Sequence, residues 1–495
     1  MEEKMILRTR TTSAILAVAS IGTAMIVACR SDDIVNGNPP TQVTLANTSV
    51  TPALVKNLMS GVTAYSLLSS DDVLSGSPNY VFGGSTDGAG LLHNADNTFT
   101  LVVNNEDNFA VSRVTLDATF KPVKGEYILT SDNAKYRLCS ATLVTPEEHG
   151  FGPLFITAGE SSIESSIYSL DPTGAANTAR ALPALGHWSA ENAVPLPKQA
   201  YAGKTVVVIG DDDSAAGGGQ VGLYVGTSVG DLDNGKLYAL ARTNDNVRER
   251  DMVVGQSYAV VFKEIPNAKT LTGAQINSTV NAFNAISFGR VEDVDYRKGG
   301  TGREVYFVVT GQAETGVNAD KSRSKYGRIY RLTLDAADPT KGTLEVVLDG
   351  DDRTGPAALF QNPDNVLATQ NYLYFEEDPN EYGDETHDSY LWQYNLQSKE
   401  LKPVFELDHR RNLADFGKFT NTTGTYTPVA TSNRGSWENS GIIDISDVIG
   451  KPGTFLVGVQ PHGWHAARFK GADGGALRAA EDQGSQLLVL SGLAR

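Results

Sequence analysis

The amino-acid sequence predicts an all-β protein, a β-propeller of six blades with a few short helices. Strand-like runs rich in Val, Ile, Tyr and Phe, each bounded by Gly, Asp, Asn or Pro, follow one another through the chain. A strand with alternating apolar positions that ends in a turn recurs at irregular intervals, as in Ser166–Asp171, Gly327–Leu332 and Ser389–Asn395. The chain also contains 49 glycines, which suits many tight turns.

A β-sandwich is the competing fold. Many short strands over about 450 residues would need at least two sandwiches, whereas one propeller can hold them in a single domain. Helical periodicity is confined to Pro52–Ser69 and Ala274–Ser287. The expected strands are Thr98–Asn104, Ser112–Leu116, Tyr127–Leu129, Leu154–Thr157, Thr205–Ile209, Gly222–Val225, Lys236–Leu240, Tyr258–Phe262, Val305–Val309, Arg328–Leu332, Leu344–Leu348, Tyr372–Phe375, Ser389–Tyr394 and Thr454–Val459.

Residues 1–28 have the pattern of a secretory signal, with basic residues followed by an apolar stretch shorter than the roughly 20 residues of a spanning helix. Ile26–Cys29 resembles the lipobox of bacterial lipoproteins, which implies that Cys29 becomes the lipidated first residue. An ordinary signal peptide cleaved nearby is the alternative. Arg30–Asp33 resembles the surface-export signal of Bacteroidetes lipoproteins. We therefore expect an exported lipoprotein of the outer membrane or cell surface, with a flexible tether over residues 29–48 and one propeller domain over residues 49–495.

The formal net charge of −17 excludes some partners. Nucleic acid is disfavoured because phosphate backbones select clustered Lys and Arg. Small anionic substrates are disfavoured as well, unless bound cations reverse the charge locally. We expect a monomer that contacts the membrane only through its lipid anchor. The sequence contains no Gly-x-Ser-x-Gly elbow, P-loop or His-Glu-x-x-His motif.

Cys139 has no intramolecular partner once Cys29 is lipidated, because the chain has only 2 cysteines. An unpaired thiol in an exported protein is expected to be buried or bound. Acidic residues near the ends of apolar runs would converge with it in the channel of a propeller, where they repel one another unless cations lie between them. Oxygen ligands suit calcium, and a thiolate adds affinity for a softer metal such as iron or zinc. These residues are Glu106, Glu160, Glu191, Glu292, Asp364 and Glu377.

The alternative for Cys139 is a small core residue, and for the carboxylates it is a set of solvated strand ends. The order and spacing of ten segments argue against these alternatives. The segments are Asp87–Gly90, Leu101–Glu106, Ser112–Asp117, the residues around Cys139, Phe155–Glu160, Ser189–Glu191, Arg290–Glu292, Pro363–Asn365 with Glu376–Asp378, and Gly458–Gly463. From Asp87 to the C-terminus, these segments resemble the PhoX family of bacterial alkaline phosphatases.

The resemblance implies a propeller whose pore holds an iron–calcium cluster and hydrolyses phosphate monoesters. By motif, Cys139, Glu191 and Glu292 would be iron ligands. Glu106, Glu160, Asp364 and Glu377 would hold calcium or the outer parts of the cluster. Arg290 would bind the phosphate through its paired donors.

The sequence departs from the family pattern at Asn105 and Ala190, where the family has His, and at Ala158–Gly159, where it has Cys-Glu. Such neighbours of metal ligands affect metal occupancy and metal choice. We expect a phosphatase of small phosphorylated substrates. The alternatives are a lactonase-like propeller hydrolase that uses one calcium and no cysteine, and a non-catalytic calcium-binding surface lipoprotein.

Overall fold

The computed structural model describes residues 42–380, 382–420 and 436–495, so the expected signal peptide, Cys29 and most of the expected tether lie outside the described residues. The described chain packs from its first residues. Val43 is buried, and the Thr44 amide donates a hydrogen bond to the Thr119 carbonyl at 3.1 Å. Among the described residues, we find no helix with the length and apolar character that a bilayer crossing requires.

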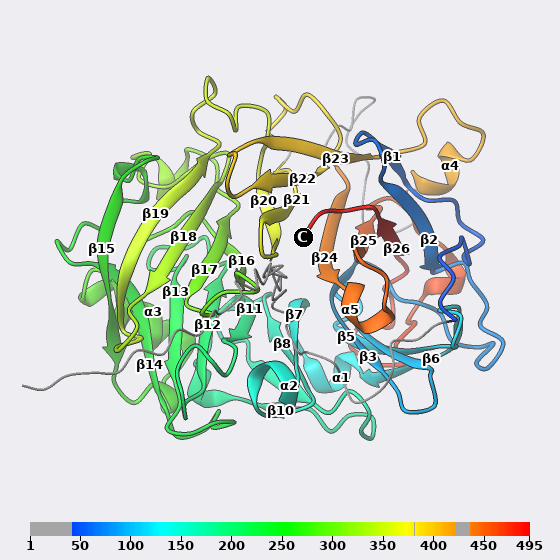
Figure 1. The fold of residues 1–495 in the computed structure, drawn as a ribbon, viewed down its shortest axis with the longest axis horizontal. Coiled ribbons are helices and arrows are strands. Elements are labelled where there is room, and N and C mark those ends of the chain that lie inside the picture. Colours follow the sequence, from blue (N-terminus) through cyan, green and yellow to red (C-terminus); the bar gives the residue numbers. More distant parts are fainter. Residues whose placement is uncertain (1–41, 381, 421–435) are drawn as a thin grey trace, which may run out of the picture. The chain divides into compact units, whose positions relative to one another are not determined.

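The described chain is all-β with a few short helices (Figure 1). Its strands are β1 Val55–Asn57, β2 Thr63–Ser69, β3 Thr86–His93, β4 Phe99–Asn105, β5 Ala110–Leu116, β6 Pro122–Leu129, β7 Leu138–Val144, β8 Leu154–Gly159, β9 Ile167–Leu170, β10 Arg180–Ala181, β11 Ala190–Pro195, β12 Val206–Asp211, β13 Val221–Val225, β14 Lys236–Arg242, β15 Ser257–Ile265, β16 Val291–Tyr296, β17 Glu304–Val309, β18 Arg328–Leu334, β19 Lys341–Asp349, β20 Pro363–Ala368, β21 Tyr372–Glu377, β22 Tyr390–Asn395, β23 Leu401–Leu407, β24 Glu438–Asp444, β25 Thr454–Gln460 and β26 Gln486–Ser491. The α-helices are α1 Ser131–Ala134, α2 Pro146–His149, α3 Gly273–Ala282, α4 Phe416–Phe419 and α5 Ser446–Ile449.

The strands form antiparallel sheets that run outward from a common centre (Figure 1). Three sheets have four strands each, in the orders β3-β4-β5-β6, β7-β8-β9-β10 and β24-β25-β26-β2. A fourth has five strands, in the order β20-β21-β22-β23-β1. The N-terminal strands β1 and β2 therefore complete sheets whose other strands come from the C-terminal part of the chain.

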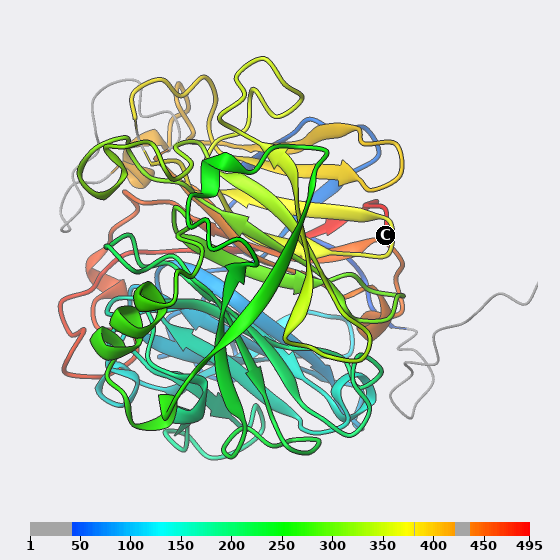
Figure 2. The same cartoon turned by 90° about the vertical axis from the view of Figure 1, so that its left-hand side faces the viewer.

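The remaining sheet has nine strands, in the order β11-β12-β13-β14-β15-β19-β18-β17-β16. Strand β15 pairs with β14 on one side and with β19 on the other. The end strands β11 and β16 contact each other without pairing, so the sheet nearly closes into a barrel. Figure 2 shows this sheet in front, with its strands coloured green to yellow-green.

One end strand of each four- or five-stranded sheet and both end strands of the nine-stranded sheet lie at the centre, and we call these six the first strands. Strands β3, β7, β11, β16, β20 and β24 contact one another in this cyclic order, and β24 returns to β3. Apolar side chains fill the space between neighbouring sheets, as Val102, Leu138 and Phe155 do between the sheets of β4 and β8. This arrangement is propeller-like, and it brings the starts of the first strands together.

The prediction of an all-β, propeller-like protein is confirmed, whereas the sheets do not by themselves give six blades. The helix expected over Ala274–Ser287 is present as α3, capped by Thr272, and ends at Ala282. The helix expected over Pro52–Ser69 is wrong, because this segment forms β1 and β2. Pairing with β23 and β26 supplies backbone partners that local periodicity cannot reveal.

Candidate metal centre

The first strands share an irregularity near their starts. The register shifts between Thr86 and Ala89 in β3, Leu138 and Ala141 in β7, Ala190 and Ala193 in β11, Val291 and Val294 in β16, Pro363 and Val366 in β20, and Ser440 and Ile443 in β24. Such bulges turn a side chain away from the regular strand alternation. The first residue inside the shift is a potential metal ligand in β3, β7, β11, β16 and β20: Asp87, Cys139, Glu191, Glu292 and Asp364.

The second residue inside each shift forms a supporting layer. Asn192 Nδ2 donates a hydrogen bond to Asp293 Oδ1 at 2.6 Å, and Asn365 Nδ2 donates to Ser140 Oγ at 2.6 Å. In β3 this position is Gly88, where a Cβ would lie 2.2 Å from the Ala141 nitrogen. The first strands are therefore tied to one another by side-chain amides and by one close backbone approach.

A cavity of about 450 Å³ lies over these strand starts. Acidic residues from the ends of second strands complete its wall, since Glu106 follows β4, Glu160 follows β8 and Asp378 follows β21. The lining residues are Asp87, Glu106, Asp107, Arg137, Cys139, Glu160, Glu191, Arg290, Glu292, Asp364, Asp378, Glu438, His462, Arg478, Glu481 and Gln483.

The cavity thus brings together almost all residues expected from the sequence. Cys139, Glu106, Glu160, Glu191, Glu292, Asp364 and Arg290 all line it. Cys139 is the one free cysteine among the described residues and is 3 % exposed. Its Sγ donates a hydrogen bond to Glu160 Oε2 at 3.2 Å.

Glu377 does not join this group. Its carboxylate is fully buried and accepts hydrogen bonds from the Gln361 amide (3.0 Å), the Tyr390 amide (2.8 Å) and Trp392 Nε1 (2.7 Å). Its Oε2 also lies 3.0 Å from His387 Nε2. These partners hold Glu377 inside its own sheet, and the next residue, Asp378, reaches the cavity in its place.

The donor set fits divalent and trivalent cations. Three groups place their ligand atoms within 4.8 Å of one another: Asp87, Glu106 and Cys139; Glu191, Glu292 and Asp364; and Asp364, Asp378 and Glu438. Asp87 Oδ1 is buried and has no hydrogen-bond partner among the described residues. A buried carboxylate oxygen of this kind normally has a partner, and a cation would supply one.

Burial dominates the electrostatics of these carboxyls. Burial, opposed in part by neighbouring arginines, raises the pKa of Glu106, Glu160 and Glu292 to about 7. Burial and then the Glu160 and Glu191 carboxylates raise the pKa of the Cys139 thiol well above its usual value. A cation among these groups would reverse both effects by favouring the ionised forms.

Arg290 is held rigidly at the cavity wall. Its Nε donates to Asp212 Oδ1 at 2.6 Å, its Nη1 donates to Asn380 Oδ1 at 3.1 Å, and its Nη2 lies 2.8 Å from Glu292 Oε1. Its backbone has a φ of +71°, in the left-handed region that few residues with a side chain adopt. The surrounding structure must therefore hold this segment in place.

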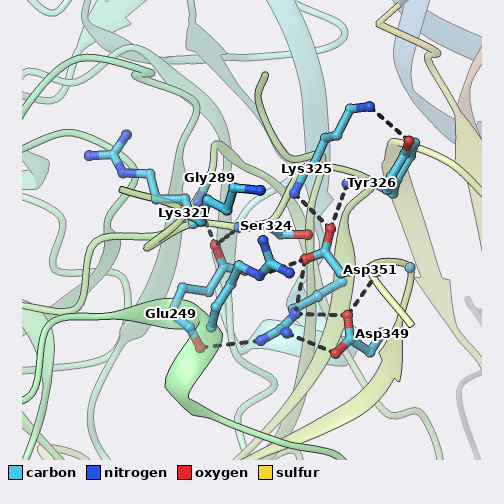
Figure 3. A network of polar contacts seen from close by, with 12 residues as sticks. Glu249, Gly289, Lys321, Ser324, Lys325, Tyr326, Asp349 and Asp351 are labelled. Atoms are coloured by element: carbon cyan, nitrogen blue, oxygen red, sulfur yellow. Dashed lines mark hydrogen bonds and ion pairs between the residues drawn. The ribbon is translucent and has the colours of Figure 1, made fainter. Parts of the chain in front are cut away.

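A buried carboxylate supplies part of that support (Figure 3). Glu249 Oε2 accepts hydrogen bonds from the backbone amides of Gly289 (2.9 Å) and Ser324 (2.8 Å), and Glu249 Oε1 accepts one from the Tyr330 hydroxyl (3.0 Å). Gly289 immediately precedes Arg290, so Glu249 fixes the backbone from which Arg290 projects. Neighbouring Asp351 accepts from the amides of Lys325 (2.9 Å) and Tyr326 (3.2 Å), which belong to a different loop.

Several cavity residues are not among the ligands expected from the sequence, although the sequence points to His462 as the histidine closest to a functional role. Asp87 stood in a motif segment, Asp378 in the acidic run and His462 in the last segment, so a signal existed for each. Glu438 is the first residue of β24, and its Oε1 accepts a hydrogen bond from Gln460 Nε2 at 3.0 Å. The sequence of β24 resembles no family motif. Arg137 stands two residues before Cys139, as Arg290 stands two before Glu292, and this parallel was the available signal.

No protein-family model matches the sequence, and a search among curated proteins finds no match. Solved structures do match. PhoX of Pseudomonas fluorescens in complex with vanadate, a transition-state analogue, superposes with a TM-score of 0.59 at 14% identity, over 91% of this chain and 99% of that one. The fold is PhoX-like. The PQQ-bound aldose sugar dehydrogenase of Streptomyces coelicolor is more distant, with a TM-score of 0.38 at 10% identity, over 86% of this chain and 98% of that one.

Proposed function

We propose that this chain hydrolyses phosphate monoesters with the help of calcium and iron bound in the cavity. The observation that carries the proposal is the convergence of Cys139, carboxylates from successive first strands and Arg290 on one cavity. The PhoX-like fold, seen in a protein that binds the phosphoryl transition-state analogue vanadate, supports it.

Within this proposal, the soft ligand Cys139 holds iron together with Glu191 and Glu292. Oxygen ligands suit calcium, and we assign Glu106, Glu160, Asp364 and Asp378 to it, with Asp378, which lines the cavity, in the place expected for Glu377. When bound, the cations neutralise charge on the phosphoryl oxygens and lower the pKa of water.

The residues of the chain orient the substrate. Arg290 presents its guanidinium at the cavity wall, where paired N–H donors match phosphoryl oxygens. Asp212 and Asn380 prevent it from turning away. Preorganised charge of this kind stabilises the developing negative charge of the transition state without further rearrangement.

The proposal extends to the fold and the cellular location. We infer that the nine-stranded sheet is two blades, β11–β14 and β16–β19, joined at their outer edges through β15, which makes six blades with the four separate sheets. From the predicted lipobox at Cys29 we infer that the reaction takes place in the cell envelope, where a small phosphorylated substrate reaches a monomer that is anchored by its lipid.

Elemental analysis together with hydrolysis of a generic aryl phosphate tests the proposal. We expect iron and calcium to co-purify and phosphate to be released. Cys139→Ala should lose iron and at least about 10²-fold in kcat/KM, whereas Cys139→Ser, which keeps an oxygen ligand, should lose less. Calcium alone, with no phosphate release and no effect of Cys139→Ala on any lactone hydrolysis, would favour the lactonase-like alternative.

A further inference from the structure

Arg137 occupies the same position before β7 that Arg290 occupies before β16. Each stands two residues ahead of the potential ligand inside the register shift, Cys139 or Glu292. Both arginines line the cavity. The parallel placement directs two guanidinium groups from different sheets at the same space.

The two guanidinium groups differ in their partners. Arg137 Nη1 lies 3.3 Å from Glu106 Oε1 and 3.8 Å from Glu160 Oε2, and its Nη2 lies 3.7 Å from Asp107 Oδ1. Two of these three distances are too long for a good hydrogen bond. Arg137 Nε has no hydrogen-bond partner among the described residues, and the side chain is 39% exposed, against 20% for Arg290.

Two of the carboxylates that form long ion pairs with Arg137 are also proposed calcium ligands. On the proposed function, Glu106 and Glu160 turn their oxygens toward calcium. A cation that shares these carboxylates would weaken their attraction for Arg137, which keeps its charge and has a donor, Nε, without a partner among the described residues.

We propose that Arg137 is a second substrate-binding residue that contacts phosphoryl oxygens together with Arg290 and selects monoesters over diesters. A phosphate monoester offers three non-bridging oxygens and up to two negative charges, whereas a diester offers two oxygens and one charge. Two guanidinium groups with paired donors are therefore satisfied by a monoester and left partly unsatisfied by a diester. This inference rests on the proposed function.

The test compares wild type, Arg137→Ala, Arg137→Lys and the matched control Arg113→Ala. Arg113 is also a partly buried arginine, but it belongs to β5, pairs with Glu126 of β6 at 3.1 Å and does not line the cavity. The probes are an aryl phosphate, a bis(aryl) phosphate diester and inorganic phosphate as a competitive inhibitor. Metal content is measured in every preparation.

We expect Arg137→Ala to raise KM for the monoester and the inhibition constant of phosphate about tenfold, with metal content unchanged. The preference for monoester over diester should fall by a similar factor, and Arg137→Lys should restore part of both. Arg113→Ala should match wild type.

If Arg137→Ala is active and its KM for the monoester and inhibition constant of phosphate equal those of wild type, this inference is overturned and the proposed function remains intact. Loss of metal with unchanged phosphate affinity would also overturn it, since Arg137 would then support the metal ligands only. A wild-type protein that neither hydrolyses the aryl phosphate nor binds inorganic phosphate by calorimetry would overturn both proposals.

Discussion

The starts of β7 and β16 present the same residue type in the same place with different surroundings. Arg290 stands on a left-handed backbone, bonds to Asp212 at 2.6 Å and is supported from behind by Glu249 through Gly289. Within the described part of the chain, Arg137 has only ion pairs of 3.3 to 3.8 Å, all with cavity carboxylates. Repetition of a sheet therefore repeats the position of a side chain, while the residues around it decide whether that side chain is rigid or free to respond to ligands.

The comparison predicts the largest loss of activity at the rigid arginine. We expect Arg290→Ala to lower kcat/KM about 10²–10³-fold, because a fixed group acts mainly on the transition state. Arg137→Ala should act mainly on KM. Steady-state kinetics with an aryl phosphate measures both, and equal kcat and KM effects in the two variants would remove the distinction.

Glu249 offers a way to loosen Arg290 without touching it. Glu249→Ala leaves two buried amides without an acceptor, at about 1–3 kcal/mol of unfolding free energy each, and should raise KM about tenfold as Gly289 shifts. Glu249→Gln keeps an acceptor oxygen and should restore KM. KM is read from the same assay, and stability from denaturant unfolding.

Asp351→Ala is the matched control, since Asp351 also accepts two backbone amides in this network but does not contact Gly289. It should lose similar stability with KM unchanged. If Asp351→Ala and Glu249→Ala changed KM equally, the position of Arg290 would depend on the stability of the whole sheet and not on Glu249 in particular.

A smaller effect is expected on how the free energy of unfolding depends on pH when a chelator has removed bound metal. Burial raises the pKa of Glu106, Glu160 and Glu292 to about 7. Between pH 4.5 and about 7, these three groups therefore bind more protons in the folded protein than in the unfolded protein. The free energy of unfolding should therefore fall as pH rises through this window, by up to about 1.4 kcal/mol per pH unit for each group.

Arginine variants sharpen this prediction. Arg137 lowers the pKa of Glu106 and Glu160, and Arg290 lowers that of Glu292. In Arg137→Ala or Arg290→Ala, the decrease in the free energy of unfolding should therefore extend to higher pH. Calcium should abolish the fall in wild type. Denaturant unfolding at pH 5 to 8 provides the measurement, and a flat profile in chelator would contradict the burial of ionisable groups.

The sequence predicted the outer strands better than the central ones. Expected strands such as Thr205–Ile209 and Val305–Val309 coincide with β12 and β17. None of the first strands β3, β7, β11, β16, β20 and β24 was on the list of expected strands. In Val291–Tyr296, Glu292 lines the cavity, whereas Asp293 and Asp295 accept hydrogen bonds from backbone amides of β20. A bulge also lies within the strand, so the alternation of apolar and polar residues that reveals a strand is lost.

The same cause limited the prediction of the cavity. The order of the motifs indicated Cys139, Glu191 and Glu292, because each lies in a segment that resembles a family motif. Glu377 was preferred to Asp378 because adjacent acidic residues on one strand cannot be told apart without knowing which face meets the centre. Arg137 was overlooked because its significance depends on comparing two sheets.

The pairing of β2 with β26 has a consequence for biosynthesis. Ser69 at the end of β2 lies opposite Gln486, so the sheet to which both belong is completed only when almost the whole chain has been made. Until then, β2 and β25 present unpaired backbone edges, which are targets for proteolysis and aggregation. A chain that ends before β26 keeps both of these edges unpaired, because β26 is the strand that pairs with β2 and with β25.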